Sequence, residues 1–339
     1  MPNVAVLGCA HIHTPRFVSM MNARSNVQVK YVWDHDMARA ARVAQDLGSS
    51  TANTIQDVLT DARVEAIIIL SETNRHEDIV ITAANAGKPM FVEKPLGMDG
   101  PSAARMAEVI QANNVLFQTG FFMRGQAIYQ TLKQHIAEGN FGKLTRVRGS
   151  FVHHGALAGF FDTEWRWMAD PAQAGVGAFG DLGAHVLDLL LWLLRDGAGE
   201  VRKVTAVLDD GTVRYPDCDE LGEGLLRFES GLIASLAAGW NDLANPLPLA
   251  LYGTEGQAYV VGSTLYIHST KLGTDGPTAW TDLAPALPHA FELFLDALED
   301  KDVPLVTAQE AAYSAHVMDM LYQSAKQERW LELKQVSSD

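Results

Sequence analysis

Three side chains of this sequence have the chemistry to move a proton at an alcohol: Lys94, Asp181 and His185. Lys94 follows the short apolar run 90–92, and Pro95 ends that run because proline lacks an N–H and restricts the residue before it. We therefore expect Lys94 at a strand end, where α/β sheets bind their ligands, as a donor to a substrate oxygen. The alternative is a solvated lysine that closes a salt bridge.

The stretch from Gly175 to Asp188 is first glycine-rich and then apolar. Asp181, His185 and Asp188 are four and three residues apart, so on a helix they share one face. Histidine titrates near neutrality and is the usual base for an alcohol proton. We expect His185 to act as acid or base, Asp181 to orient it or to bind a neighbouring hydroxyl, and Lys94 to stabilise the developing alkoxide. The alternative is an N-cap aspartate beside a structural histidine.

Composition limits the class of protein. A chain of 339 residues predicts two domains, and 47% hydrophobic with 20% charged residues is typical of a soluble globular protein. The net charge of −15 argues against nucleic acid or a membrane surface as partner. Cys9 and Cys218 are too few for a disulfide framework or a thiolate metal site. No signal segment is evident, and the apolar stretch 186–194 is too short to span a bilayer, so we expect a cytoplasmic protein.

The order of the expected elements changes near Gly142. Before it, apolar runs alternate with helical patterns, which predicts βαβ units and a parallel sheet; after it, short strands and turns at 229–231 and 253–256 predict antiparallel neighbours. The expected strands are 4–7, 27–33, 66–70, 91–92, 116–120, 144–152, 201–208, 224–228, 232–238, 249–252, 258–261 and 265–267. The expected helices are 15–23, 37–47, 55–59, 76–86, 102–113, 182–194, 289–298 and 308–327.

The predicted fold class is therefore α/β with two domains. Residues 1–122 are expected to form a Rossmann domain with a doubly wound parallel sheet. Residues 123–339 are expected to form an α+β domain with a large, mainly antiparallel open sheet, whose C-terminal helices pack back on the first domain.

The loop after the first strand has a partial dinucleotide-binding pattern. Gly8 matches the fingerprint, while Ala10 and His13 stand at the second and third glycine positions. Asp34 ends the second strand at about the separation expected for a carboxylate that binds a ribose diol, and it would repel the extra phosphate of NADP. We therefore expect NAD rather than NADP, with Asp36 as a rival ribose ligand and an ordinary helix N-cap as the alternative.

The pair His11 and His13 permits a second hypothesis. Two histidines after a buried strand are also typical of metal-dependent amidohydrolases. That function requires a barrel of eight βα units, which the antiparallel second half does not provide. We expect no metal, and these imidazoles to line the cofactor loop.

Several motifs together resemble the Gfo/Idh/MocA oxidoreductases, the family of glucose–fructose oxidoreductase and inositol dehydrogenase. Glu93-Lys94-Pro95 follows a strand, and Asp181-x-x-x-His185-x-x-Asp188 comes later in the chain. Arg124, the run Gly139-x-x-Gly142-Lys143-Leu144, and Trp165-Arg166 stand in the family's order. The resemblance covers nearly the whole chain. It departs in the missing later glycines of the first loop, and in Glu72, where the family commonly has proline.

The resemblance implies an NAD(P)-dependent dehydrogenase that oxidises or reduces a secondary alcohol of a sugar, cyclitol or related polyol. Lys94, Asp181 and His185 match the family's catalytic residues. The implied cofactor-binding residues are Gly8, Ala10, His11, Ile12, Asp34, His35, Ser71, Glu72, Thr73, His76, Glu93 and Lys94. Arg124, His153, Trp165, Arg166, Asp181 and His185 are the expected substrate contacts, although Trp165 equally fits a core anchor, Arg166 a surface ion pair and His153 a structural role. A homodimer or homotetramer through the C-terminal sheet is implied, and a non-catalytic NAD-dependent sensor remains the second hypothesis.

Overall fold

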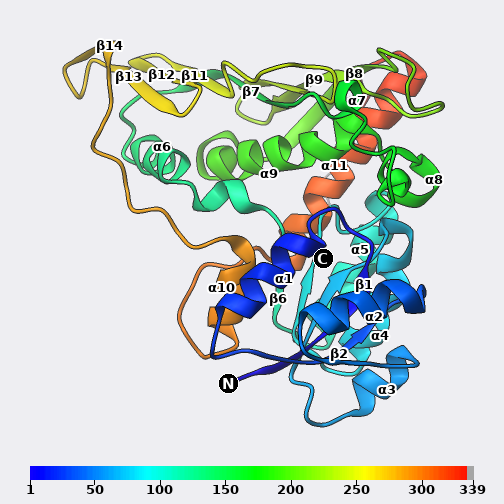
Figure 1. The fold of residues 1–339 in the computed structure, drawn as a ribbon. Coiled ribbons are helices and arrows are strands. Elements are labelled where there is room, and N and C mark those ends of the chain that lie inside the picture. The colour runs from blue at the N-terminus through cyan, green and yellow to red at the C-terminus, as the bar shows by residue number, and fades with distance from the viewer. Residues whose placement is uncertain (334–339) are drawn as a thin grey trace. The chain divides into compact units, whose positions relative to one another are not determined.

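The structure, a computed structural model, describes residues 1–333, which form two compact units, each with one sheet (Figure 1). The first unit comprises residues 1–121, 161–175 and 288–316. The second comprises residues 122–160, 176–287 and the described residues from 317 onward.

The first unit is built on a six-stranded parallel sheet in the order β3-β2-β1-β4-β5-β6. Its strands are β1 (Asn3–Cys9), β2 (Gln28–Trp33), β3 (Ser50–Thr51), β4 (Ala66–Leu70), β5 (Met90–Val92) and β6 (Phe117–Thr119). The continuous apolar sequence of β4 and β5 fits strands that are buried on both faces. The chain order reverses between β1 and β4, and a sheet of this kind binds its ligand at that point.

The first unit also contains helices, of which those up to α5 connect the strands. They are α1 (Thr14–Ala23), α2 (Met37–Asp46), α3 (Ile55–Thr60), the 3-10 helix η1 (Thr73–Arg75), α4 (His76–Asn85), α5 (Gly100–Ala112), η3 (Arg166–Ala169), α8 (Pro171–Ala174) and α10 (Ala290–Ala297). Thr54 and Asp99 form capping boxes that fix the starts of α3 and α5. Helix α10 completes the core from late in the sequence, because Phe291 packs against Phe17 and Phe91 with ring centroids 4.9 and 5.1 Å away.

The second unit is built on a nine-stranded sheet in the order β14-β13-β12-β11-β7-β10-β9-β8-β15. Its strands are β7 (Leu144–Val152), β8 (Val201–Asp209), β9 (Leu221–Phe228), β10 (Ile233–Gly239), β11 (Leu249–Gly253), β12 (Gly256–Val261), β13 (Thr264–Ser269), β14 (Thr274–Ala279) and β15 (Leu331–Glu332). Every pair is antiparallel except β7 with β10. The predicted fold class, a parallel Rossmann sheet and a mainly antiparallel open sheet, is confirmed.

Helix α9 (Ala178–Ala198) is the central helix of the second unit and packs on β7, β9 and β10. Helix α6 (Ala127–Ala137) lies against it on the same face of the sheet (Figure 1). The unit also contains η2 (Phe122–Gly125) and α7 (Gly155–Ala158), and α11 (Ala308–Gln327) runs from the first unit into the second. By length and composition alone, residues 171–198 qualify as a membrane span, but 78% of that window is buried, as expected for a core helix.

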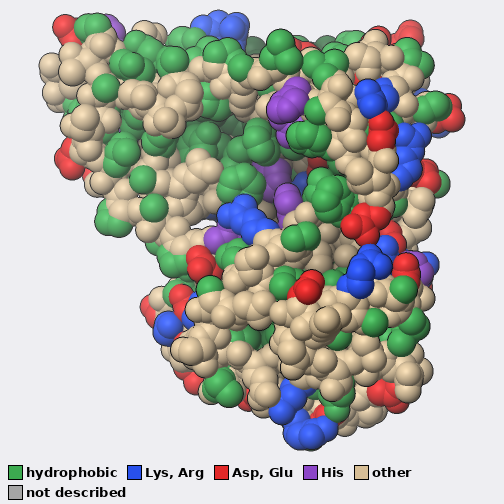
Figure 2. All heavy atoms as spheres, viewed as in Figure 1, with side chains coloured by type: hydrophobic (Ala, Val, Ile, Leu, Met, Phe, Trp, Pro, Cys, Tyr) green, Lys and Arg blue, Asp and Glu red, His purple; other side chains and the backbone are tan. Residues whose placement is uncertain are grey.

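The surface agrees with the charge of the sequence. Lysine and arginine side chains are scattered singly or in small groups among acidic ones, without an extended basic patch on the face in view (Figure 2).

Candidate active site

In the loop that follows β1, the backbone passes close to the backbone at the end of β4, at the carboxyl end of the parallel strands. Gly8 has φ +82°, and a Cβ atom there would lie 2.4 Å from the Cβ of Ser71 at the end of β4. Only glycine fits this position, for reasons of both conformation and space. The loop then enters α1 with His13 as N-cap and Pro15 in the first turn, which leaves an open helix N-terminus for an anion.

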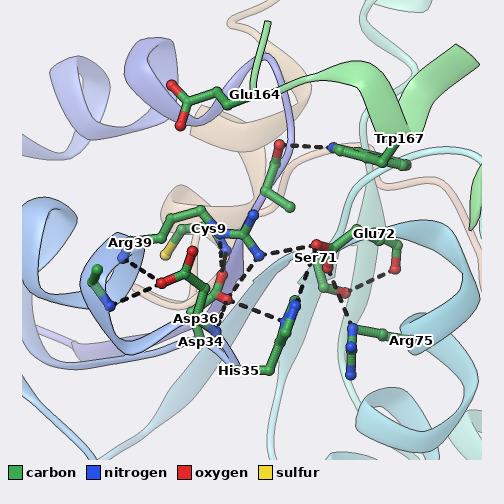
Figure 3. A network of polar contacts seen from close by, with 12 residues as sticks. Cys9, Asp34, His35, Asp36, Arg39, Ser71, Glu72, Arg75, Glu164 and Trp167 are labelled. Carbon is green, nitrogen blue, oxygen red and sulfur yellow. Dashed lines mark hydrogen bonds and ion pairs between the residues drawn. The ribbon is translucent and has the colours of Figure 1, made fainter.

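Asp34, at the end of β2, is fully enclosed by hydrogen-bond donors (Figure 3). One carboxylate oxygen accepts from the backbone N–H of Cys9 at 2.6 Å, and the other accepts from the N–H of Asp36 at 2.8 Å. Arg39 adds a bidentate pair, Nε at 2.9 Å and Nη2 at 2.8 Å. Four N–H groups therefore occupy the acceptor sites of a side chain with 0% exposure.

Arg39 is held from two sides. Besides Asp34, its Nη2 donates to Glu72 Oε1 at 2.9 Å, and Glu72 follows β4. Burial alone would lower the pKa of Arg39, but the two carboxylates outweigh it and raise that pKa above its ordinary value. His35 lies 3.2 Å from Asp34 and 3.7 Å from Glu72, and Arg75 Nε lies 3.5 Å from Glu72 Oε2. Residues from β2, α2 and the β4 end thus form one ionic network.

The two loop histidines gather around Glu93. His13 Nδ1 lies 3.2 Å from Glu93 Oε1, the rings of His11 and His13 have centroids 4.8 Å apart, and the ligand-type atoms of the three residues lie within 4.8 Å of one another. Burial disfavours the Glu93 carboxylate, but His11, His13 and Lys94 outweigh burial and hold its pKa well below the usual value. His11 Nδ1 accepts the backbone N–H of His13 at 3.2 Å, which orients the His11 ring within the loop.

The amidohydrolase hypothesis is wrong. It requires a closed barrel of eight βα units, whereas the described residues form two open sheets, of six and nine strands. The histidine pair therefore belongs to the loop of a doubly wound sheet.

Lys94 stands immediately after β5 and is 2% exposed. Its backbone N–H donates to Glu93 Oε2 at 2.8 Å, so Glu93 fixes the backbone from which the lysine side chain extends. His76 ties the next residues to the β4 end, since its ring contacts the carbonyl oxygens of Leu96 at 3.1 Å and Ser71 at 3.3 Å. Burial lowers the pKa of His76, so the neutral ring is favoured and it serves as a brace.

In the second unit, α9 carries Asp181 and His185 one turn apart, as the spacing predicts. Asp181 Oδ2 accepts from Trp240 Nε1 at 3.2 Å, and both residues are buried. His185 is 3% exposed, and its ring meets the edges of Phe122 and Phe151 with centroids 4.8 and 5.7 Å away. A buried carboxylate and a buried imidazole thus share one helix face among aromatic rings.

The start of α9 is fixed by two residues that sequence reasoning missed, Tyr322 and Asp219. The Tyr322 hydroxyl accepts the N–H groups of Gly177 and Gly180 at 3.1 and 2.9 Å and donates to Asp219 at 2.9 Å. Asp219 also accepts the N–H of Phe179 at 2.8 Å. Burial raises the pKa of both Asp219 and Tyr322.

Arg124, His153, Trp165 and Arg166 are the remaining predicted substrate contacts. Arg124 forms a bidentate pair with the buried Asp188, at 2.9 and 2.6 Å. His153 Nδ1 accepts the N–H of Gly155 at 3.0 Å just after β7. Trp165 is half-buried and Arg166 is exposed. Their roles toward a substrate stay predictions.

Trp167 was also missed by sequence reasoning. It is buried, and its Nε1 donates to the carbonyl oxygen of Ala10 at 3.0 Å, so it braces the loop after β1 (Figure 3). The tryptophan-rich run Trp165-Arg166-Trp167 was the only available signal. The predicted cofactor residues all belong to the first unit, as does Lys94, whereas Asp181 and His185 belong to the second.

Two family descriptions match this chain. Residues 2–121 match "Oxidoreductase family, NAD-binding Rossmann fold", and residues 129–259 match "GFO/IDH/MocA C-terminal domain". Among curated relatives, the scyllo-inositol 2-dehydrogenase (NAD(+)) of Bacillus subtilis (strain 168) is 26% identical over 328 residues, 92% of this chain and 91% of that protein. The levoglucosan dehydrogenase of Pseudarthrobacter phenanthrenivorans is 27% identical over 64% of this chain and 60% of that protein.

Solved structures show the same fold. A levoglucosan dehydrogenase in complex with NADH and levoglucosan superposes with a TM-score of 0.80, over 98% of this chain and all of that chain, at 22% identity. The matched part of the chain thus includes both sheets and the residues described above.

Proposed function

Since this chain belongs to the Gfo/Idh/MocA family of oxidoreductases, with an NAD-binding Rossmann domain, we propose that it oxidises a secondary alcohol of a sugar, cyclitol or related polyol, or reduces the matching ketone. The observation that carries the proposal is that Lys94 in the first unit and His185 in the second are both buried, in a chain similar over nine-tenths of its length to an inositol dehydrogenase. Similarity to a levoglucosan dehydrogenase supports the same substrate class.

The first unit fits a dinucleotide. The Gly8 loop lets backbone approach the pyrophosphate at the α1 N-terminus, and the Asp34 network lies at the strand end where an adenosine ribose binds in such sheets. When bound, NAD supplies the hydride acceptor. The Asp34 carboxylate favours NAD over NADP because it would repel the extra phosphate, and a preference for NADP would contradict this part of the proposal.

The chain's own residues then handle the proton. The His185 imidazole takes the proton of the reacting hydroxyl, and the Lys94 ammonium donates a hydrogen bond to the same oxygen as negative charge develops. Asp181, fixed by Trp240, binds a neighbouring hydroxyl or orients the imidazole.

The cellular location and the oligomeric state of the enzyme are also part of what we propose. We expect a cytoplasmic homodimer or homotetramer that assembles through the nine-stranded sheet. Light scattering of the purified protein measures this state directly.

A panel of sugars, cyclitols and sugar acids with NAD, and of ketoses with NADH, tests the function. Turnover is expected for at least one polyol, and Lys94→Met and His185→Asn are each expected to lower kcat by about 10²-fold or more while NADH still binds. Lys326→Met and His268→Asn, at exposed positions, are the matched controls. NADH binding without turnover of any substrate would favour the sensor.

A further inference from the structure

The ionic network around Arg39 bears on the choice between NAD and NADP. In doubly wound sheets a carboxylate after the second strand binds the ribose 2′-hydroxyl of NAD, or a nearby arginine binds the 2′-phosphate of NADP. This chain has both groups, Asp34 and Arg39, and they are bound to each other by two hydrogen bonds. Neither residue alone therefore determines which cofactor is accepted.

A third residue, Glu72, determines which hydrogen-bond donors of Arg39 are already occupied. It reaches the guanidinium from the end of β4, across β1 from the strand that carries Asp34. Glu72 is 5% exposed, and its Oε2 accepts no hydrogen bond from any described residue; Arg75 Nε, at 3.5 Å, is the nearest cation shown. A buried carboxylate in this position is costly unless it interacts with a charge, and Arg39 is the charge it contacts directly.

Glu72 also contributes to the net charge of the side chains around Arg39. The charged side chains that contact one another here are two carboxylates, Asp34 and Glu72, and two guanidinium groups, Arg39 and Arg75, which gives a formal charge of zero with neutral histidine. Removal of the Glu72 charge raises this sum to +1 and frees one Nη2 N–H of Arg39 from a charged acceptor.

We infer that Glu72 is a positioning residue that sets the cofactor preference, because it withholds Arg39 from the 2′-phosphate of NADP and offsets the positive charge of the guanidinium group. The inference rests on the proposed NAD-dependent function and names the residue behind its cofactor preference. Asp34 also accepts the backbone N–H groups of Cys9 and Asp36, and a substitution at Glu72 removes neither of these contacts.

The test measures cofactor binding without substrate, from nicotinamide fluorescence of NADH and of NADPH. Glu72→Gln is expected to tighten NADPH binding about tenfold and to change NADH binding by less than about threefold. Glu72→Asp, which keeps the charge, is expected to keep the preference for NADH. In Glu72→Gln with Arg39→Gln, the gain in NADPH affinity is expected to disappear.

Glu77→Gln is the matched control, since Glu77 forms an exposed ion pair with Arg105 in the same unit. Thermal melting checks that each variant is folded. An unchanged ratio of the two affinities in folded Glu72→Gln, or a tenfold gain that persists without Arg39, would overturn the inference. Binding of neither cofactor by the unaltered protein would instead overturn the proposed function.

Discussion

Glu93 holds together the part of the site that carries Lys94. It is 2% exposed and accepts the N–H of Lys94 at 2.8 Å, while His13 lies 3.2 Å from its other oxygen. A Cβ at Gly120 would lie 2.7 Å from Glu93, so the carboxylate fits a closed space. Charge and shape both constrain this residue.

Substitution of Glu93 by Gln is expected to destabilise the protein by about 2 kcal/mol, because a buried amide cannot satisfy both donors as a carboxylate does. Urea unfolding measures the loss. Glu77→Gln, an exposed pair, is expected to cost less than about 1 kcal/mol. Equal losses in the two variants would show that the Glu93 charge has no special role.

At the level of single residues, the sequence indicated candidate site residues better than it indicated which side chains contact one another. Lys94, Asp181 and His185 were found from strand ends and helix spacing, and all three are buried. Arg39 donates a hydrogen bond to Asp34, five residues away, and Trp167 donates one to Ala10, 157 residues away. Such pairings have no periodicity in the sequence.

Among the elements, α9 depends on a residue far along the chain for its start. The Tyr322 hydroxyl satisfies two N–H groups of the first turn, where no side chain of α9 itself forms a cap. A Cβ atom at Gly177 would lie 2.5 Å from Asp219, so glycine leaves room for that residue. The orientation of Asp181 and His185 therefore depends on α11 (Figure 1).

Tyr322→Phe is expected to lower stability by about 1–3 kcal/mol, because two helix N–H groups and buried Asp219 lose their partner. It is also expected to lower kcat with unchanged NADH affinity, since α9 carries His185 and the cofactor residues lie elsewhere. Tyr266→Phe is the control: its ring stacks on Tyr259 and the ring is retained. A loss of stability without any change in kcat would limit Tyr322 to a structural role.

Element prediction succeeded where apolar runs were continuous. The strand at Ala66–Leu70 and the strand at Leu144–Val152 have the predicted bounds. Helix α6 was missed because its polar and apolar residues are mixed, and β14 was missed because it contains Gly276 and Pro277. The two-residue β15 exists only through its pairing with β8.

For the molecule as a whole, stability is expected to depend on His289, which caps α10 by accepting the N–H of Phe291 at 3.2 Å. Burial, with a smaller effect of Arg16, lowers the pKa of His289 to about 4. A depressed folded-state pKa means that the stabilising effect is present above the ordinary value of 6.5 and is lost as pH falls toward 4.

The free energy of unfolding is therefore expected to fall by about 2 kcal/mol between pH 7 and pH 4.5 through this group. His289→Asn replaces the capping nitrogen by an amide oxygen that does not titrate, so its decrease over the same range should be smaller by that amount. Urea titrations at both pH values measure the difference. Parallel decreases in the two proteins would exclude His289 as the cause.

The whole-molecule predictions were confirmed at the level of family and fold, because alternating strand and helix patterns followed by close-spaced strands are evident in the sequence. Which residues belong to each unit was less evident from the sequence. Residues 161–175 and 288–316 belong to the first unit although they follow much of the second in the chain. Only packing, such as Phe291 on Phe91, shows that.

The most direct test of the central claim is a double-mutant cycle on the rate of hydride transfer, measured by stopped flow with saturating NAD and polyol. Lys94→Met, His185→Asn and the double variant are compared with the unaltered protein. If both groups act on one oxygen, the double variant should be little slower than the slower single variant. Fully additive losses, with each single variant acting independently, would contradict the account.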